Sequence, residues 1–465
     1  MSSPVDSMEG DMSNEAFDPL HCARLYNAII RTGFHRSQRS RRGDSLRRNW
    51  FKVYKSDPVL EEYYDSISPQ LIPFLESIEI AIGPDENPYA RDVLVHHLQA
   101  IASPAAMFVH RSDSIEDCLI LFPNNSSEPT CIGTVMEPGL LVTHAASEET
   151  FSLDDENNYW YPLSELLDRL LKMIMVGKYK AVPYDQVNQD NNPFCEGLNY
   201  WEVIPWNEYI LNEAVEAYEG LVEAITRRLP PSSRQQISNE RTPIATVDTL
   251  AQEIQGFPRA FLLEAPKPGF KFIAPGLTVY DTSDPPLPVR HAVGADMVDR
   301  IEHAYREVSC HELRHDPIVL FPSLENQKHR EEQAGLWILP TWGWADTVKL
   351  ALPYDLFSYP DYRGTMIDYS PAEAGFVPTR ATLWETPHTC PFFYEHGTRL
   401  VNILDRWKDL VECGVWTVGE EGVQGGMDFY RQASDPQRAE DFCIGRICFD
   451  VPDVDEGDGD VVWAT

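Results

Sequence analysis

Between residues 296 and 344 the sequence reads DMVDRIEHAYREVSCHELRH (296–315), DPIVLFP (316–322) and, further on, GLWILPTWGW (335–344). Apolar residues at helical spacing predict a helix over 296–311. Short apolar runs bounded by proline and glycine predict buried strands at 318–321 and 336–339. A helix followed by neighbouring strands, rather than a regular strand–helix alternation, favours an α+β fold.

Helical spacing and short apolar runs also predict the elements of the rest of the chain. Helical spacing with nearby Pro or Gly stop signals predicts further helices at 17–32, 59–67, 89–102, 163–176, 207–228, 247–254 and 399–413. Short β-branched or apolar runs predict strands at 107–110, 118–122, 131–135, 140–143 and 348–352. We therefore expect an α+β protein with mixed or antiparallel sheets and flanking helices.

Two short patterns recur in the two halves of the chain. Leu-Phe-Pro occurs at 121–123 and 320–322, each time after a predicted helix (90–102 and 296–311). Leu-Asp-Arg occurs later, at 167–169 and 404–406, within helices expected to end at Gly177 and Gly414. The pattern suggests an internal duplication with a large insertion in the second copy.

Chain length and linker composition suggest two units. A chain of 465 residues exceeds what one small core usually organises. PPSSRQQISNERTP has three prolines and no apolar periodicity, which is typical of a linker. The predicted organisation is an acidic tail (1–15), an N-terminal α/β half (16–229), a linker (230–243), a C-terminal α+β half with aromatic-rich loops (244–449) and a second acidic tail (450–465).

Composition restricts the compartment and the partners. The chain has 38 basic and 73 acidic residues, a net charge of -35, which repels DNA and anionic membranes. Its nine cysteines form no CxxC pair, which favours a reducing compartment. The sequence has no secretory signal pattern and no apolar run of the ~18 residues that a transmembrane helix requires. We therefore expect a cytoplasmic protein with no DNA or membrane partner.

One motif has the spacing of a zinc site. His311-Glu312-Leu313-Arg314-His315 matches HExxH, in which two histidines one helical turn apart bind zinc and the Glu activates water. This pattern predicts His311 and His315 as metal ligands and Glu312 as the base of a zinc-dependent hydrolase. The alternative is a plain helix end, because the following Asp316-Pro317 stops the helix there.

Six of the eleven tryptophans fall between residues 337 and 416, among many Tyr and Phe residues. Large apolar walls with a few polar groups are typical of a small-molecule pocket, although the same rings could simply fill a core. The pocket hypothesis assigns Asp368, Glu385 and His388 to catalysis and assigns ligand contact to Trp337, Trp342, Trp344, Tyr369 and Arg363.

A basic stretch between Arg31 and Lys55 contrasts with the acidic chain. It holds nine of the 38 basic residues, interleaved with aromatic residues, a composition suited to phosphate contact and base stacking. The alternatives are a solvated loop or a segment that docks on the protein's own carboxylates; Arg39-Ser40-Arg41-Arg42 could also direct nuclear import. The residues assigned to phosphate or RNA binding are Arg39, Arg41, Arg42, Arg47 and Arg48.

The sequence contains no nucleotide-binding glycine motif and no serine-hydrolase or kinase motif, so no cofactor is evident apart from the zinc hypothesis. The leading hypothesis is a cytoplasmic enzyme that acts on a small organic molecule in an aromatic-lined pocket of the C-terminal half, with an unknown reaction type. The alternatives are an RNA- or phosphate-binding protein, or an RNA-dependent transferase, using residues 31–55, and a zinc-dependent hydrolase at 311–315.

Overall fold

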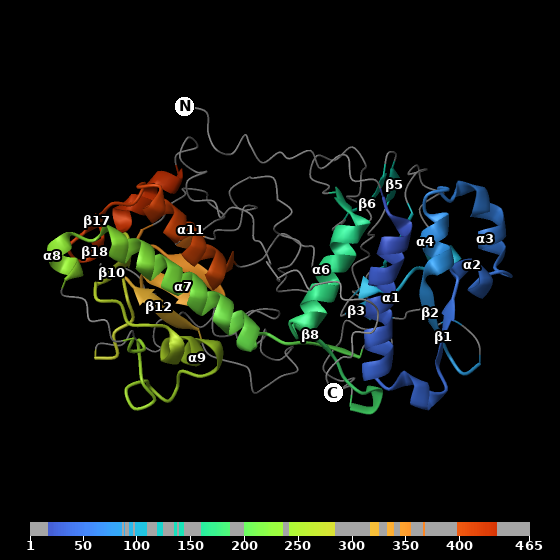
Figure 1. The fold of residues 1–465 in the computed structure, drawn as a ribbon, viewed down its shortest axis with the longest axis horizontal. Helices are drawn as coiled ribbons and strands as arrows, with labels where there is room; N and C mark the ends of the chain where they lie inside the picture. Colours follow the sequence, from blue (N-terminus) through green and yellow to red (C-terminus); the bar gives the residue numbers. More distant parts are fainter. Residues whose placement is uncertain are drawn as a thin grey trace.

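The computed structural model confirms an α+β fold built from helices and small, mostly antiparallel sheets (Figure 1). It describes residues 17–85, 88, 93–95, 98–108, 119–123, 134–136, 139–143, 160–186, 200–235, 241–283, 317–324, 333–338, 345–354, 366–367 and 398–434. No helix in these ranges is both long and apolar enough to cross a membrane.

The first half contains two packed helices, α1 and α6, with short elements around them. Asp18 starts α1 by accepting hydrogen bonds from the backbone N–H groups of Leu20 and His21. The helices are α1 (Pro19–Arg36), α2 (Trp50–Val53), α3 (Pro58–Tyr63), α4 (Ile72–Ser77), α5 (Pro104–Met107) and α6 (Leu163–Met175), with the 3-10 helices η2 (Arg39–Arg42), η3 (Tyr64–Ser66) and η6 (Tyr184–Gln186).

Within the described residues, the strands of the first half form four small antiparallel sheets. These are β1 (Ser45–Arg48) with β2 (Glu79–Ile82), β3 (Val93–Val95) with β4 (Leu98–Gln99), β5 (Thr134–Met136) with β6 (Gly139–Thr143) and β7 (Trp160–Pro162), and β8 (Tyr179–Ala181) with β9 (Trp201–Val203).

The second half is built around α7, which packs on α11 and α9. Asn207 begins α7 by accepting a hydrogen bond from the Ile210 N–H group. The helices are α7 (Glu208–Arg228), α8 (Pro231–Arg234), α9 (Gly256–Glu264) and α11 (Leu400–Glu412), with the 3-10 helix η11 (Met427–Ser434).

In the part of the second half that the structure describes, two sheets accompany these helices. One has the order β11-β10-β18-β17, formed by β10 (Phe272–Ala274), β11 (Leu277–Thr278), β17 (Val418–Gly419) and β18 (Gly422–Val423). The other has the order β12-β13-β14-β15, with β16 also paired to β14; it is formed by β12 (Ile318–Pro322), β13 (Gly335–Ile338), β14 (Thr347–Ala351), β15 (Met366–Ile367) and β16 (Thr398–Arg399).

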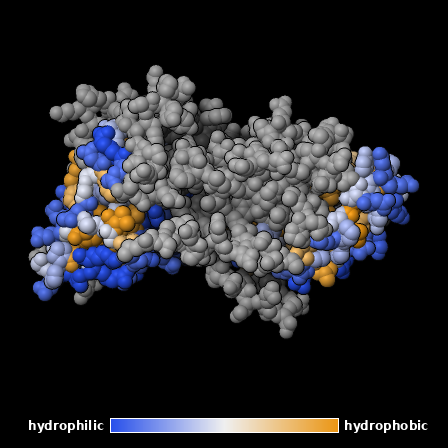
Figure 2. Space-filling view, turned by 90° about the horizontal axis from the view of Figure 1, so that it is seen from above, coloured by the Kyte–Doolittle hydropathy of each residue, from blue (hydrophilic) through white to orange (hydrophobic). Residues whose placement is uncertain are grey.

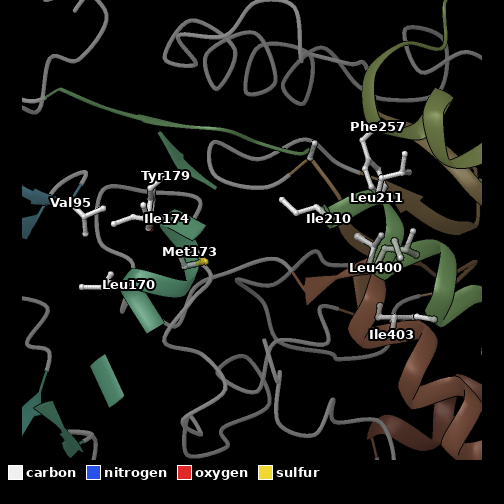
Figure 3. Packing of buried hydrophobic residues seen from close by; sticks show 14 of the residues in the cluster. Val95, Leu170, Met173, Ile174, Tyr179, Ile210, Leu211, Phe257, Leu400 and Ile403 are labelled. Atoms are coloured by element: carbon white, nitrogen blue, oxygen red, sulfur yellow. The ribbon is translucent and has the colours of Figure 1, made fainter. Parts of the chain in front are cut away.

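Figure 1 places α7 beside α9 and α11, away from α1 and α6. The sequence analysis assigned residues 207–228 to the first half and a linker to 230–243. In the structure the chain passes between the two groups of elements before α7, and α8 lies inside the expected linker. Figure 3 shows the buried side chains of each half, with Leu170 and Ile174 in one group and Leu211 and Leu400 in the other.

The two halves share an arrangement of three aromatic rings. In the first half Tyr26 of α1 meets Phe74 of α4 edge-on (6.0 Å, 75°) and stacks on Phe122 (6.0 Å, 21°). In the second half Tyr218 of α7 meets its α9 neighbour, Phe261, edge-on (5.6 Å, 77°) and stacks on Phe321 (6.1 Å, 13°). Each stacked Phe belongs to a Leu-Phe-Pro segment.

A hairpin with the same register follows in each half. In the first, Val93 lies opposite Gln99 and Val95 opposite Leu98; in the second, Phe272 lies opposite Thr278 and Ala274 opposite Leu277. Each hairpin then bonds to the proline of a Leu-Phe-Pro segment. The Gln99 N–H group donates to the Pro123 carbonyl oxygen (2.8 Å), and the Thr278 hydroxyl donates to that of Pro322 (3.0 Å).

The Leu-Asp-Arg helices α6 and α11 also end alike. Each follows directly on a strand that pairs antiparallel with an inner strand of its sheet, β7 with β6 and β16 with β14. Each ends at a glycine with positive φ, 76° at Gly177 and 74° at Gly414, as is common at helix C-termini. The duplication stays a hypothesis; in the shared arrangement the corresponding first helices are α1 and α7, not the segments 90–102 and 296–311.

Three predicted elements of the first half are wrong. The expected helix at 89–102 contains the β3–β4 hairpin, because Val93, Leu94 and Val95 are all buried in an extended strand. The expected strand at 107–110 begins in a helix: Ser103 caps α5, which ends at Met107. Residues 119–122 are not a strand, although the Ala102 N–H group donates to the Leu121 carbonyl oxygen.

One expected helix of the second half is also wrong. Residues 247–254 form turns, because the Thr249 hydroxyl accepts from the Thr246 N–H group and so diverts the backbone from helical pairing. Gly256, expected to stop that helix, is instead the first residue of α9, and Pro258 lies in its first turn. The helix expected at 296–311 lies outside the described residues.

The shared aromatic arrangement allows a matched pair of substitutions. The Tyr26 hydroxyl accepts a hydrogen bond from the Ile101 N–H group (3.2 Å), so Tyr26→Phe should lower the free energy of unfolding by about 1 kcal/mol. Among the described residues, the buried Tyr218 hydroxyl has no hydrogen-bond partner, and burial raises its pKa. Tyr218→Phe should therefore be neutral or slightly stabilising. Urea denaturation of both variants measures the difference; equal losses would mean that Tyr218 has a bound partner.

Candidate phosphate-binding surface

The structure describes only part of the predicted site residues, namely Trp337 and the five arginines at 39, 41, 42, 47 and 48. The residues assigned to the small-molecule pocket and the zinc motif lie outside the described ranges: Asp368, Glu385, His388, Trp342, Trp344, Tyr369, Arg363, His311, Glu312 and His315. The pocket and zinc hypotheses therefore stay predictions. Within the described ranges, no three His, Cys, Asp or Glu side chains gather as metal ligands would.

The described tryptophans of the aromatic block are buried. Trp337 is buried in β13, and its indole N–H group donates to the Gln333 carbonyl oxygen (2.9 Å). Trp407 lies 6.0 Å from Phe321 and 5.8 Å from Trp416, measured between ring centroids. These described rings form core contacts, as the alternative interpretation of the block expects.

The basic segment, residues 31–55, is fully described; it begins in the last turns of α1 and continues through a tight turn that contains η2. Arg39 of η2 lies in the interior with Asp44, and their side chains are only 1% and 0% exposed. The Arg39 Nε donates to Asp44 Oδ2 (3.0 Å), and the guanidinium lies 5.7 Å from the ring centres of Phe34 and Tyr200. Arg39 therefore stabilises the turn and is not exposed for contact with a phosphate.

The next residues fix the rest of the basic segment to the core. Strand β1 pairs with β2, which places Arg47 opposite Ile80 and Arg48 opposite Glu79. Asn49 then caps α2, and the buried Trp50 donates its indole N–H group to the Ala102 carbonyl oxygen (2.9 Å). The cations of this segment are thus carried on defined secondary structure.

Most of the remaining cations face solvent. Arg31 pairs with Glu79 (2.6 Å) across the surface. The exposed cation set, as we name it, consists of Arg36, Arg41, Arg42, Arg47, Arg48, Lys52 and Lys55. The residues coloured at the end of the molecule that holds α2 and α3 are mostly hydrophilic (Figure 2). Asp44 is the only carboxylate between residues 31 and 55, and it is buried with Arg39.

No family model, curated protein or solved structure matches the chain. We therefore infer the function from the residues themselves. The surface offers cations on a fixed backbone and, beside them, aromatic rings. Tyr64 is 47% exposed and its ring lies 5.6 Å from that of Phe51 in α2.

Sequence reasoning identified the basic segment but missed the different role of Arg39. An Asp five residues from an Arg, next to a glycine, is the only local signal, and it does not show which of seven arginines is buried. The contribution of Tyr64 was also missed, because it lies nine residues beyond Lys55 and reaches the segment only through packing against Phe51.

Proposed function

We propose that the protein binds single-stranded RNA through its exposed cation set. The observation that carries this proposal is the burial of Asp44 with Arg39, which removes the one carboxylate of the basic segment from the surface. Seven cations are exposed over 20 residues of this segment. Phosphate groups are neutralised by such surfaces, and counterion release supplies much of the binding free energy.

The aromatic neighbour favours a single strand over a duplex. Bases of single-stranded RNA can stack on exposed rings, and one stacked base contributes about 1–3 kcal/mol as judged by alanine substitution. Tyr64 offers such a ring beside the basic segment. A long duplex would also lie against the rest of a chain whose net charge is -35, which repels it.

Charge reversal tests the proposal directly. Arg41→Glu with Arg42→Glu should weaken binding of a fluorescent single-stranded RNA about tenfold or more at low salt, because two phosphate contacts become repulsive. Lys180→Glu with Lys267→Glu is the matched control, since both lysines are exposed outside the basic segment and the charge change is the same. Fluorescence anisotropy of the full chain measures the affinities. An equal loss in both double variants, or no RNA binding by the wild type, would contradict the proposal.

A further inference from the structure

Because the two halves share an arrangement of helices, strands and rings, residues at corresponding positions can be compared. The helices α6 and α11 each follow a strand directly and each end at a glycine. Their N-cap residues differ, however. Pro162 precedes α6, whereas Arg399 precedes α11. Arg399 is buried, so the second half carries a charge in its core at a position where the first half has none.

Arg399 bonds to two carboxylates from different elements. Its Nε donates to Asp346 Oδ2 (3.0 Å), just before β14, and its Nη2 donates to Glu213 Oε2 (3.1 Å) on α7. The side chains of Arg399, Asp346 and Glu213 are 1%, 0% and 17% exposed. The Leu400 N–H group also donates to the Asp346 carbonyl oxygen (2.8 Å), so this cluster joins α7, α11 and β14.

The cluster has one positive and two negative groups. Among the described residues, the groups that face Glu213 are Arg399, Asp346 and the hydroxyl of Tyr209. One guanidinium can neutralise only one carboxylate, so a second negative charge stays in a poorly hydrated place. Such a charge is costly, and a group in this position commonly takes up a proton instead.

We propose that Glu213 is a proton-accepting site of the second half, where the Glu213–Arg399–Asp346 cluster takes up one proton per chain in weakly acidic solution. At the corresponding position before α6, the first half has Pro162 instead of an arginine. Glu213 differs from Asp346 because only its side chain is partly exposed, which gives protons from solvent a path to it. This inference does not rest on RNA binding.

The electrostatics of Glu213 agree with this assignment. Burial raises the pKa of Glu213, and the charge and hydrogen bond of Arg399 offset this effect only in part. The folded state therefore binds the proton more tightly than the unfolded state does. This contribution to stability is present at low pH and is lost as the pH rises through the folded-state pKa of Glu213.

Hydrogen exchange of the full chain tests the proposal. After correction for intrinsic rates, the protection of α7 and α11 amides in the wild type should rise several-fold from about pH 8 to about pH 5. The rise should be much smaller in Glu213→Gln; burial also raises the pKa of Asp405 on α11, so a residual rise is expected there. Glu223→Gln, which changes an exposed carboxylate on α7, should keep the wild-type response. Protection that falls on acidification in the wild type, or a pH response in Glu213→Gln as large as that of the wild type, would overturn the assignment.

Discussion

Arg39→Ala should lower the free energy of unfolding by about 3–5 kcal/mol, the usual cost of removing one partner of a buried ion pair. The substitution leaves the Asp44 carboxylate without its Arg39 Nε contact in the interior and removes the guanidinium that lies against Phe34 and Tyr200. Chemical denaturation monitored by Trp fluorescence measures the loss, and the buried Trp50 reports on this half.

Arg41→Ala is the matched control for that experiment. Arg41 is two residues away in the same 3-10 helix but is exposed, so its removal should change stability by no more than about 0.5 kcal/mol. The two substitutions should also reduce RNA affinity for different reasons: Arg41→Ala removes a phosphate contact, whereas Arg39→Ala distorts the segment that presents the others. Equal stability of both variants would show that the Arg39–Asp44 pair does not hold the turn.

Arg399→Ala should be comparably destabilising, again by about 3–5 kcal/mol. It removes the only cation of the Glu213–Arg399–Asp346 cluster and leaves two carboxylates close together with little solvent. Because the cluster joins α7, α11 and β14, we expect loss of amide protection to concentrate in the second half. Hydrogen exchange resolved by peptide locates the effect.

A double substitution separates charge from packing in this cluster. Adding Glu213→Gln to Arg399→Ala removes one of the two uncompensated carboxylates, so the double variant should be more stable than Arg399→Ala alone. The pair should be strongly non-additive, since both residues belong to one network. If Glu213→Gln worsens the effect of Arg399→Ala, then the surplus negative charge is not what makes the cluster costly.

The elements predicted well from the sequence carry their own local signals. The helices expected at 163–176, 207–228 and 399–413 correspond to α6, α7 and α11, with strong apolar periodicity and, for α6 and α11, a C-terminal glycine. The segment 89–102 failed because VLVHHLQAIA fits a helical and an extended pattern equally well. The segment is extended because it pairs within the β3–β4 hairpin and because Gln99 bonds to Pro123.

The candidate sites were less predictable because they depend on contacts between distant residues. Composition marked residues 31–55 as unusual, but burial of Arg39 depends on Tyr200, which is 161 positions away. The Glu213–Arg399–Asp346 cluster joins residues up to 186 positions apart, and no motif connects them. The similarity between Tyr26 and Tyr218 likewise depends on ring geometry, which the sequence does not show.

The salt dependence of RNA affinity tests the central claim most directly. A plot of log affinity against log salt should have a slope that becomes shallower by about 3 when Arg41, Arg42, Arg47 and Arg48 are all changed to Gln, because each lost phosphate contact on a single strand accounts for about 0.7. The same slope in the wild type and the fourfold variant would place any RNA contact elsewhere and contradict a phosphate-binding role for the basic segment.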